Sequence, residues 1–336
     1  MAVIALALRE IDNNIRTPFV VEEAAHVLLD AFHLPYLPLP SSHAMNDGPA
    51  WEAWTQDQRC ALQTQISNSV LKGIAPQVVV FDCLPNPAFA DAAVSSQIPI
   101  VLCLREMRDL TSYLDHVRDI LSHVSLIVIP HPDGTIRLPD GLAAKSHFVG
   151  QIVRQTAPAA IPNHDPSSPR IVISGGGGGY PRTVDFYNLA MKAIVNLREC
   201  YPTLTAQLIA GPLFRDWSLL QPVDRVTLIP FEVDTTSRFA EADLVICPAG
   251  YNTVAELEQL GTKTILVPAE RQWDDQFARA DRTARERGNF RVFRGRIPTE
   301  LANLAAELLR ERIPKVIVPK RDGGMKAARL IYEMLR

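Results

Sequence analysis

The chain has 336 residues, of which 47% are hydrophobic, and a net charge of −3. This length suits two domains of ordinary size, and no apolar run approaches the roughly 20 residues of a membrane span. The start, MAVIALALREIDNN, lacks a basic region and a clear cleavage site, so we expect a cytoplasmic protein. The sequence has no basic stripe of the kind that would indicate a nucleic-acid partner. The five Cys and eight His are too dispersed to predict a metal site.

Short β-branched runs alternate with helical patterns along the chain, which predicts an α/β fold with parallel sheets. In the first half we predict strands at 17–21, 77–82, 99–105, 126–131 and 146–150, and helices near 22–32, 52–72, 86–96 and 109–122. A Pro-rich stretch without periodicity then predicts an exposed linker at 151–169. Strands resume at 170–174, 205–211, 225–230, 243–249, 263–268 and 290–295, and the last two helices fall near 298–312 and 322–335.

These elements predict two Rossmann-like domains, at 1–150 and 170–320, on either side of the linker. The last segment, 321–336, is a helix that could pack back on the first domain.

A run of glycines directly follows the first strand of the second half and precedes a helix that begins near Thr183. Its residues are Gly175, Gly176, Gly177, Gly178, Gly179 and Tyr180. Backbone N–H groups at a helix N-terminus, with no Cβ atoms in the way, favour the binding of a diphosphate. The alternative is a flexible strand-to-helix turn. The run has neither the Gly-Lys-Ser/Thr ending of a P-loop nor the GxGxxG spacing of a dinucleotide site.

A second group of candidates lies in the segment 243–268, where a strand, a small-residue turn and a helix follow one another. The turn contains Ala249 and Gly250, and the first helical turns contain Asn252, Thr253 and Glu256. Asn or Thr at this point can simply cap the helix, whereas the Glu256 carboxylate could accept hydrogen bonds from two ribose hydroxyls. After the next strand, Asp275 and Gln276 open another helix, where capping is again the simple explanation. Ligands of parallel sheets bind at this carboxyl edge of the strands, so three converging loops favour a ligand site.

In the order and spacing of these motifs, residues 170–295 resemble the donor-binding domain of the GT-B glycosyltransferases, specifically the lipid II-forming N-acetylglucosaminyltransferase and its relatives in glycosyltransferase family 28. The motifs are SGGGGGY, PFEVD, PAGYNTVAELEQLGT and VPAERQWDDQFARA. The resemblance implies that the glycine loop faces the donor diphosphate and that Phe231 and Glu232 flank the base, which is expected to be uracil. It also implies that Glu256 binds the ribose, that the loop from Ala249 to Thr253 abuts the phosphates, and that Asp275 and Gln276 contact the sugar. No cofactor is implied beyond the nucleotide-sugar co-substrate.

The first half resembles the acceptor domains of the same group more loosely, through VVVFD, IVLCLREMRD and LIVIPHP. It lacks the first strand of that pattern and the Gly-rich loop, which in the family approaches the phosphates and often supplies a catalytic histidine. We expect a start assigned too far downstream; replacement by another part of the domain and loss of catalysis are the alternatives.

The resemblance implies inverting transfer without a metal ion, in which a base from the first domain deprotonates the acceptor. The acidic candidates near strand ends are Asp82, Glu106 and Asp109, although Asp109 could cap a helix and Glu106 could belong to a solvated charge cluster. The acceptor is open, and peripheral contact with a membrane is possible. The alternatives are a nucleotide-sugar hydrolase or epimerase of the same fold, a non-catalytic nucleotide-sugar-binding protein and, more remotely, a Rossmann oxidoreductase.

Overall fold

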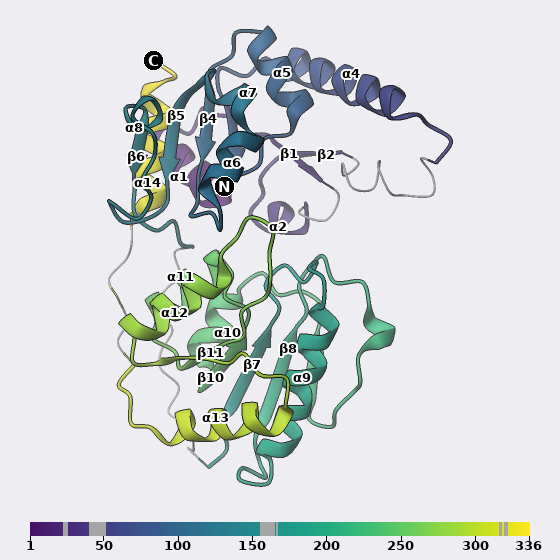
Figure 1. Ribbon diagram of the computed structural model, residues 1–336, viewed down its shortest axis with the longest axis vertical. Coiled ribbons are helices and arrows are strands. Elements are labelled where there is room, and N and C mark those ends of the chain that lie inside the picture. Colours follow the sequence, from purple (N-terminus) through teal and green to yellow (C-terminus); the bar gives the residue numbers. More distant parts are fainter. Residues whose placement is uncertain (23–25, 40–51, 155–164, 166, 316–317, 319–321) are drawn as a thin grey trace. The chain divides into compact units, whose positions relative to one another are not determined.

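A computed structural model describes the chain except for residues 23–25, 40–51, 155–164, 166, 316–317 and 319–321 (Figure 1). The chain forms two compact units, which consist of residues 1–153 with 321–336 and of residues 154–320. The linker predicted at 151–169 lies largely outside the described residues, so its course stays a prediction. In the described part of the chain, no helix is both long and apolar enough to cross a membrane.

The first unit contains two separate parallel sheets with the orders β1-β2 and β3-β4-β5-β6. Its elements, in chain order, are α1 (Ala2–Ile11), β1 (Phe19–Glu22), α2 (His26–Ala31), β2 (Tyr36–Leu39), α4 (Gln56–Ile74), β3 (Val79–Asp82), α5 (Pro87–Ser95), β4 (Ile100–Cys103), α6 (Leu110–His116), α7 (Arg118–Leu121), β5 (Val124–Ile129), α8 (Asp140–Ala143), β6 (Ser146–Phe148) and α14 (Gly323–Glu333).

Helix α1 packs against both of these sheets. Its residues Ile4 and Leu8 belong to an apolar cluster with strands β4 and β5 and with α14, whereas Ala5 packs with α2 and with the side chains of β1. One helix therefore covers two sheets that, in the described part of this unit, share no hydrogen-bonded strands.

Strand β2 is absent from the sequence prediction because Pro35 and Pro38 interrupt its apolar run. The structure pairs Pro38 with Val21 of β1, and no described strand pairs with the other side of β2. An edge strand tolerates proline because the missing N–H group costs no ladder hydrogen bond there.

The second unit is built on one parallel sheet with the order β12-β11-β10-β7-β8-β9. Its elements are β7 (Arg170–Ser174), α9 (Thr183–Leu197), β8 (Thr205–Ile209), the 3-10 turn η2 (Trp217–Leu219), β9 (Val226–Ile229), α10 (Thr235–Glu241), β10 (Leu244–Cys247), α11 (Tyr251–Leu260), β11 (Thr264–Leu266), α12 (Gln276–Glu286), β12 (Phe290–Val292) and α13 (Pro298–Arg310).

Helices cover both faces of this second sheet (Figure 1). Strand residues such as Ile171 and Ile173 pack with α9 and α13 on one face, and their neighbour Val172 packs with α10, α11 and α12 on the other. Because β7 is central, the loop that follows it leaves the sheet between two loops of neighbouring strands, which is where α/β sheets bind ligands.

Candidate functional site

The glycine run forms the loop between β7 and α9, and helix α9 begins at Thr183 as predicted. Several of the loop's amides already have partners inside the unit. Gly175 donates to the Ile209 carbonyl, Gly178 donates to the Gly175 carbonyl, and Gly176 donates to Ser174 Oγ at 3.3 Å. Among the described residues, the Gly177 and Gly179 amides have no hydrogen-bond acceptor. The loop therefore offers an anion fewer N–H donors than the five glycines suggest.

Close packing explains some of the glycines. A Cβ atom on Gly175 would lie 1.8 Å from Tyr187 Oη, and Tyr187 is fully buried beneath the loop with its hydroxyl donating to the Ala210 carbonyl. Gly178 has a φ of 78°, and a Cβ atom there would meet the Ala210 carbonyl oxygen at 2.2 Å. At Gly177 the nearest atom, Leu213 Cδ1, would be 3.6 Å away, an ordinary contact. Packing therefore does not require glycine at position 177, and binding of a ligand to the bare backbone there stays a prediction.

Helix α11 starts beside this loop. Its N-cap is Gly250, and no side chain caps the helix, so capping does not explain Asn252 or Thr253. Thr253 Oγ1 lies 3.7 Å from the position that a Cβ atom on Gly176 would take, which shows that the start of α11 faces the glycine loop. Asn252 is exposed. These polar side chains and the open loop amides therefore share one edge of the sheet.

Glu256 lies one turn further along α11 and is buried, with 6% of its surface exposed. Its Oε1 atom accepts a hydrogen bond from Arg154 Nε at 2.9 Å. Burial raises the pKa of Glu256, and the Arg154 guanidinium opposes that shift. The role of Arg154 was not predicted, because a single arginine inside a predicted linker carries no pattern.

Arg154 also joins Glu256 to the turn after β9. It donates to the Val233 carbonyl and to Thr235 Oγ1, close to the residues predicted to flank the base. In that turn Phe231 is partly exposed, and the Glu232 carboxylate accepts from the Asp234 amide and pairs with Arg238 at 3.0 Å. Arg154 thus links Glu256, the predicted ribose residue, to the turn that contains the predicted base residues.

The predicted sugar-contacting pair lies in the loop between β11 and α12. Asp275 caps α12 by accepting from the Ala278 amide at 2.9 Å. The Gln276 side chain is buried, accepts from the Ala269 amide and donates to Asp274. Both side chains hold this loop in shape, and their contact with a donor sugar stays a prediction.

A buried arginine, Arg279, fastens the same loop to its neighbour. Its Nη1 donates to the Ala249 carbonyl at 2.9 Å, and its Nη2 lies 2.7 Å from Asp274 Oδ1. Arg279 therefore connects the small-residue turn before α11 to the loop before α12. This role was not predicted, because nothing in the sequence distinguishes Arg279 from other helix arginines.

In the first unit, Asp82 ends β3 and Glu106 follows β4, so both lie at the carboxyl edge of that sheet. The Asp82 side chain is about half exposed and is 3.9 Å from Arg105 Nη2. The Glu106 amide donates to Nε2 of the buried His131, which follows β5 and was not predicted. Asp82 and Glu106 remain candidates for a base by position.

Asp109 instead caps α6. It accepts from the Ser112 amide at 3.0 Å and from the Ser112 hydroxyl at 2.6 Å. These hydrogen bonds lower the pKa of Asp109, which makes its carboxylate a weaker base. Helix capping, the alternative role that the sequence suggested for Asp109, is therefore the role that the structure shows.

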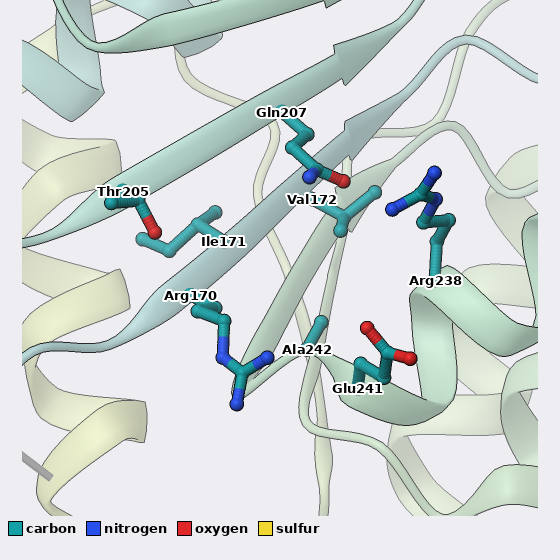
Figure 2. A pocket seen from close by; sticks show the side chains of 8 residues that line it. All are labelled: Arg170, Ile171, Val172, Thr205, Gln207, Arg238, Glu241 and Ala242. Atoms are coloured by element: carbon teal, nitrogen blue, oxygen red, sulfur yellow. The ribbon is translucent and has the colours of Figure 1, made fainter. Parts of the chain in front are cut away.

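A small cavity lies at the opposite edge of the second sheet (Figure 2). Arg170 and Thr205, the first residues of β7 and β8, line it together with Glu241 at the end of α10. No predicted donor residue lines it. Within the described ranges, no cluster of His, Cys, Asp or Glu is arranged to hold a metal ion.

Residues 212–322 match the glycosyltransferase family 28 C-terminal domain. The chain is 26% identical over 326 residues to the UDP-N-acetylglucosamine--N-acetylmuramyl-(pentapeptide) pyrophosphoryl-undecaprenol N-acetylglucosamine transferase of Bradyrhizobium diazoefficiens, which covers 90% of this chain and 85% of that protein.

Among solved structures, the glycosyltransferase of kitacinnamycin is similar with a TM-score of 0.65, at 15% identity, over 100% of this chain and 95% of that one. The UDP-GlcNAc 2-epimerase from Neisseria meningitidis bound to UDP-GlcNAc has a TM-score of 0.63, at 15% identity, over 100% of this chain and 95% of that one. At such identity these two structures show the fold alone, and they confirm the predicted pair of Rossmann-like domains.

Proposed function

Because this chain is a GT-B glycosyltransferase with a glycosyltransferase family 28 C-terminal domain, we propose that it transfers N-acetylglucosamine from UDP-N-acetylglucosamine to a hydroxyl group of a lipid-linked acceptor, with inversion at the anomeric carbon. The donor and the acceptor class are those named for its relative from Bradyrhizobium. With such an acceptor the protein works in the cytoplasm, in peripheral contact with the membrane.

The observation that carries this proposal is that the start of α11 lies beside the glycine loop. The open amides of Gly177 and Gly179 suit a diphosphate, and Thr253 faces the same loop. One turn away, Glu256 Oε1 is held by Arg154, and we assign the ribose hydroxyls to its other oxygen, Oε2. The predicted partners of phosphate and ribose thus follow one another along a single edge.

In the proposed reaction, a carboxylate of the first unit, Asp82 or Glu106, takes the proton of the acceptor hydroxyl. The acceptor oxygen bonds to C1 of the sugar as the bond from C1 to the β-phosphate oxygen breaks, and its electron pair leaves with UDP. Attack from the opposite face inverts C1. Backbone N–H groups stabilise the departing charge, so we expect transfer to persist in EDTA.

Thermal unfolding with UDP, dTDP, GDP, ADP and NAD tests the donor site. UDP at 100 times its Kd stabilises a binding protein by about 2.7 kcal/mol. We expect this shift for UDP and its loss in Glu256→Gln, whose amide keeps a hydrogen bond to Arg154. The matched control is Glu241→Gln, an exposed carboxylate at the opposite sheet edge, which should respond as the wild type does. No response of the wild type to UDP refutes the proposal.

Product analysis with radiolabelled UDP-N-acetylglucosamine and a lipid-linked acceptor then separates the alternatives. Label in the acceptor supports transfer. Free N-acetylglucosamine without acceptor indicates a hydrolase, and a donor with inverted C2 indicates an epimerase. Binding of UDP without any product indicates a non-catalytic nucleotide-sugar-binding protein.

A further inference from the structure

His131 lies at the carboxyl edge of the larger sheet of the first unit, two residues after the end of β5. It is 4% exposed, and its Nε2 atom accepts a hydrogen bond from the Glu106 amide at 3.0 Å. An imidazole nitrogen that accepts from an N–H group carries the lone pair, so the proton of the neutral ring is on Nδ1. His131 is therefore a buried acceptor that fixes one backbone position, the amide of Glu106.

The loop that carries Glu106 is fastened on two sides. Strand β4, from which this loop leaves, lies between β3 and β5. Arg105 Nε donates to Sγ of Cys83, which directly follows β3, at 2.9 Å. The next residue, Glu106, donates its amide to His131 beyond the end of β5. Two consecutive residues are thus bound to the ends of both neighbouring strands, which holds the Glu106 backbone in place where β4 ends.

A general base must lie in a fixed place to act. It has to be within hydrogen-bond reach of the proton that it removes, and a misplacement of about 1 Å can cost about 100-fold in rate. Glu106 is partly exposed, so an acceptor can reach it. Asp82 Oδ1, the alternative, accepts from Cys83 Sγ at 3.4 Å and lies 3.9 Å from Arg105 Nη2. The Asp82 carboxylate therefore belongs to the contacts on the β3 side of the loop.

Building on the proposed function, we propose that Glu106 is the base that takes the proton of the acceptor hydroxyl, and that His131 is its positioning residue. The acceptor oxygen bonds to C1 of the sugar while the electron pair of the bond from C1 to the β-phosphate oxygen leaves with UDP. His131 touches no reacting atom in this assignment. It sets the place of the Glu106 backbone, and the carboxylate is positioned through it.

Two amide substitutions test this role of His131. In His131→Gln the side-chain oxygen can take the place of Nε2 and accept from the Glu106 amide, whereas the shorter side chain of His131→Asn places its oxygen near the position of Nδ1. For transfer of label from UDP-N-acetylglucosamine to the lipid-linked acceptor, we expect His131→Asn to lower kcat by about 10- to 100-fold and His131→Gln to restore most of it. The Kd of UDP should not change, because its predicted partners lie in the second unit.

The matched control is His147→Asn, since His147 is an exposed histidine of β6 in the same sheet. It should have the kcat of the wild type. If His131→Asn melts at a lower temperature, His131→Phe serves in its place, because it keeps a ring of similar size but has no acceptor for the Glu106 amide.

Combination with Glu106→Gln separates positioning from a general effect on folding. Removal of the base should lower kcat by about 100- to 10,000-fold. Because His131 acts through Glu106, adding His131→Asn to Glu106→Gln should cost little more. A multiplied loss in the double variant would show that His131 only supports the fold of the unit, and would overturn the inference.

Two further outcomes would refute the role of His131 while the proposed function stands. One is a wild type that transfers label together with an unchanged kcat in His131→Asn. The other is a kcat that survives Glu106→Gln and is lost in Asp82→Asn. If the wild type itself transfers no label, the proposed function fails and the inference fails with it.

Discussion

The second unit has one continuous sheet, whereas the first unit has two separate sheets. This difference affects how firmly each unit can position the groups that take part in a reaction. In the second unit, β7 pairs with β10 on one side and with β8 on the other, so the glycine loop starts from a strand that is fixed on both sides. Among the described strands of the first unit, β1 and β3 each pair on one side only. Asp82, a candidate base, therefore ends a strand that has one described neighbour. A sheet that is continuous positions a ligand loop by its own hydrogen bonds, whereas an interrupted sheet depends on helix α1 to hold its parts.

Amide hydrogen exchange tests this contrast most directly. Val79 and Cys83 donate to carbonyls of the β4 side, so the alternate amides of Val80 and Asp82 point away from β4, where no described strand pairs with β3. These two amides should therefore exchange quickly, without global unfolding. The Val172 amide, inside the second sheet, should be protected by several kcal/mol more, approaching the free energy of global unfolding. Equal protection of the two strands would mean that another strand pairs with β3 in solution.

Arg154→Met should destabilise the second unit by removing the partner of a buried carboxylate. We expect a loss of about 3–5 kcal/mol in the free energy of unfolding, measured by urea denaturation. Adding Glu256→Gln should recover part of this loss, because it removes the unpaired charge. The control Arg118→Met breaks an exposed ion pair of 2.6 Å with Asp115 and should cost less than about 1 kcal/mol. Equal effects of the two variants would rule out a special role for the buried pair.

The glycine loop can be probed by paired substitutions. Gly175→Ala places a methyl group against the buried Tyr187 hydroxyl and should cost about 1–3 kcal/mol or more. Gly177→Ala meets only ordinary contacts, so its effect on stability should stay within about 0.5 kcal/mol, while the affinity for UDP falls because the backbone is less accessible. Thermal unfolding with and without UDP measures both effects. If neither variant loses affinity for UDP, the loop is purely structural.

The smallest effect concerns Asp109, whose pKa is held below its usual range by Ser112. The carboxylate's contribution to stability is present above the unfolded pKa of about 3.9 and is lost as the pH falls through the lower folded pKa. An NMR titration of the side-chain carboxyl should therefore place its midpoint below that of a free Asp, and Ser112→Ala should raise it. A midpoint near neutral pH would restore Asp109 as a candidate base.

Parts of the site could be predicted because they are local. The glycine run after an apolar strand indicates a loop at the carboxyl edge, and the structure places it between β7 and α9. Capping could also be foreseen for Asp109 and Asp275, since each precedes a helix. Which glycines are required by packing could not be foreseen, because the atoms that crowd them belong to Tyr187 of helix α9 and to Ala210, which follows strand β8.

The sequence by itself determined the alternation of strands and helices, the position of the glycine loop and the resemblance to a donor-binding domain, because periodicity and motif spacing are properties of neighbouring residues. Only the tertiary structure decided the partners of the charged groups. Arg154 reaches Glu256 from 102 positions away, and Arg271 reaches Tyr180 from another loop of the sheet. Parallel strands bring such distant loops to one edge, and a charge acquires its role there from the groups that surround it.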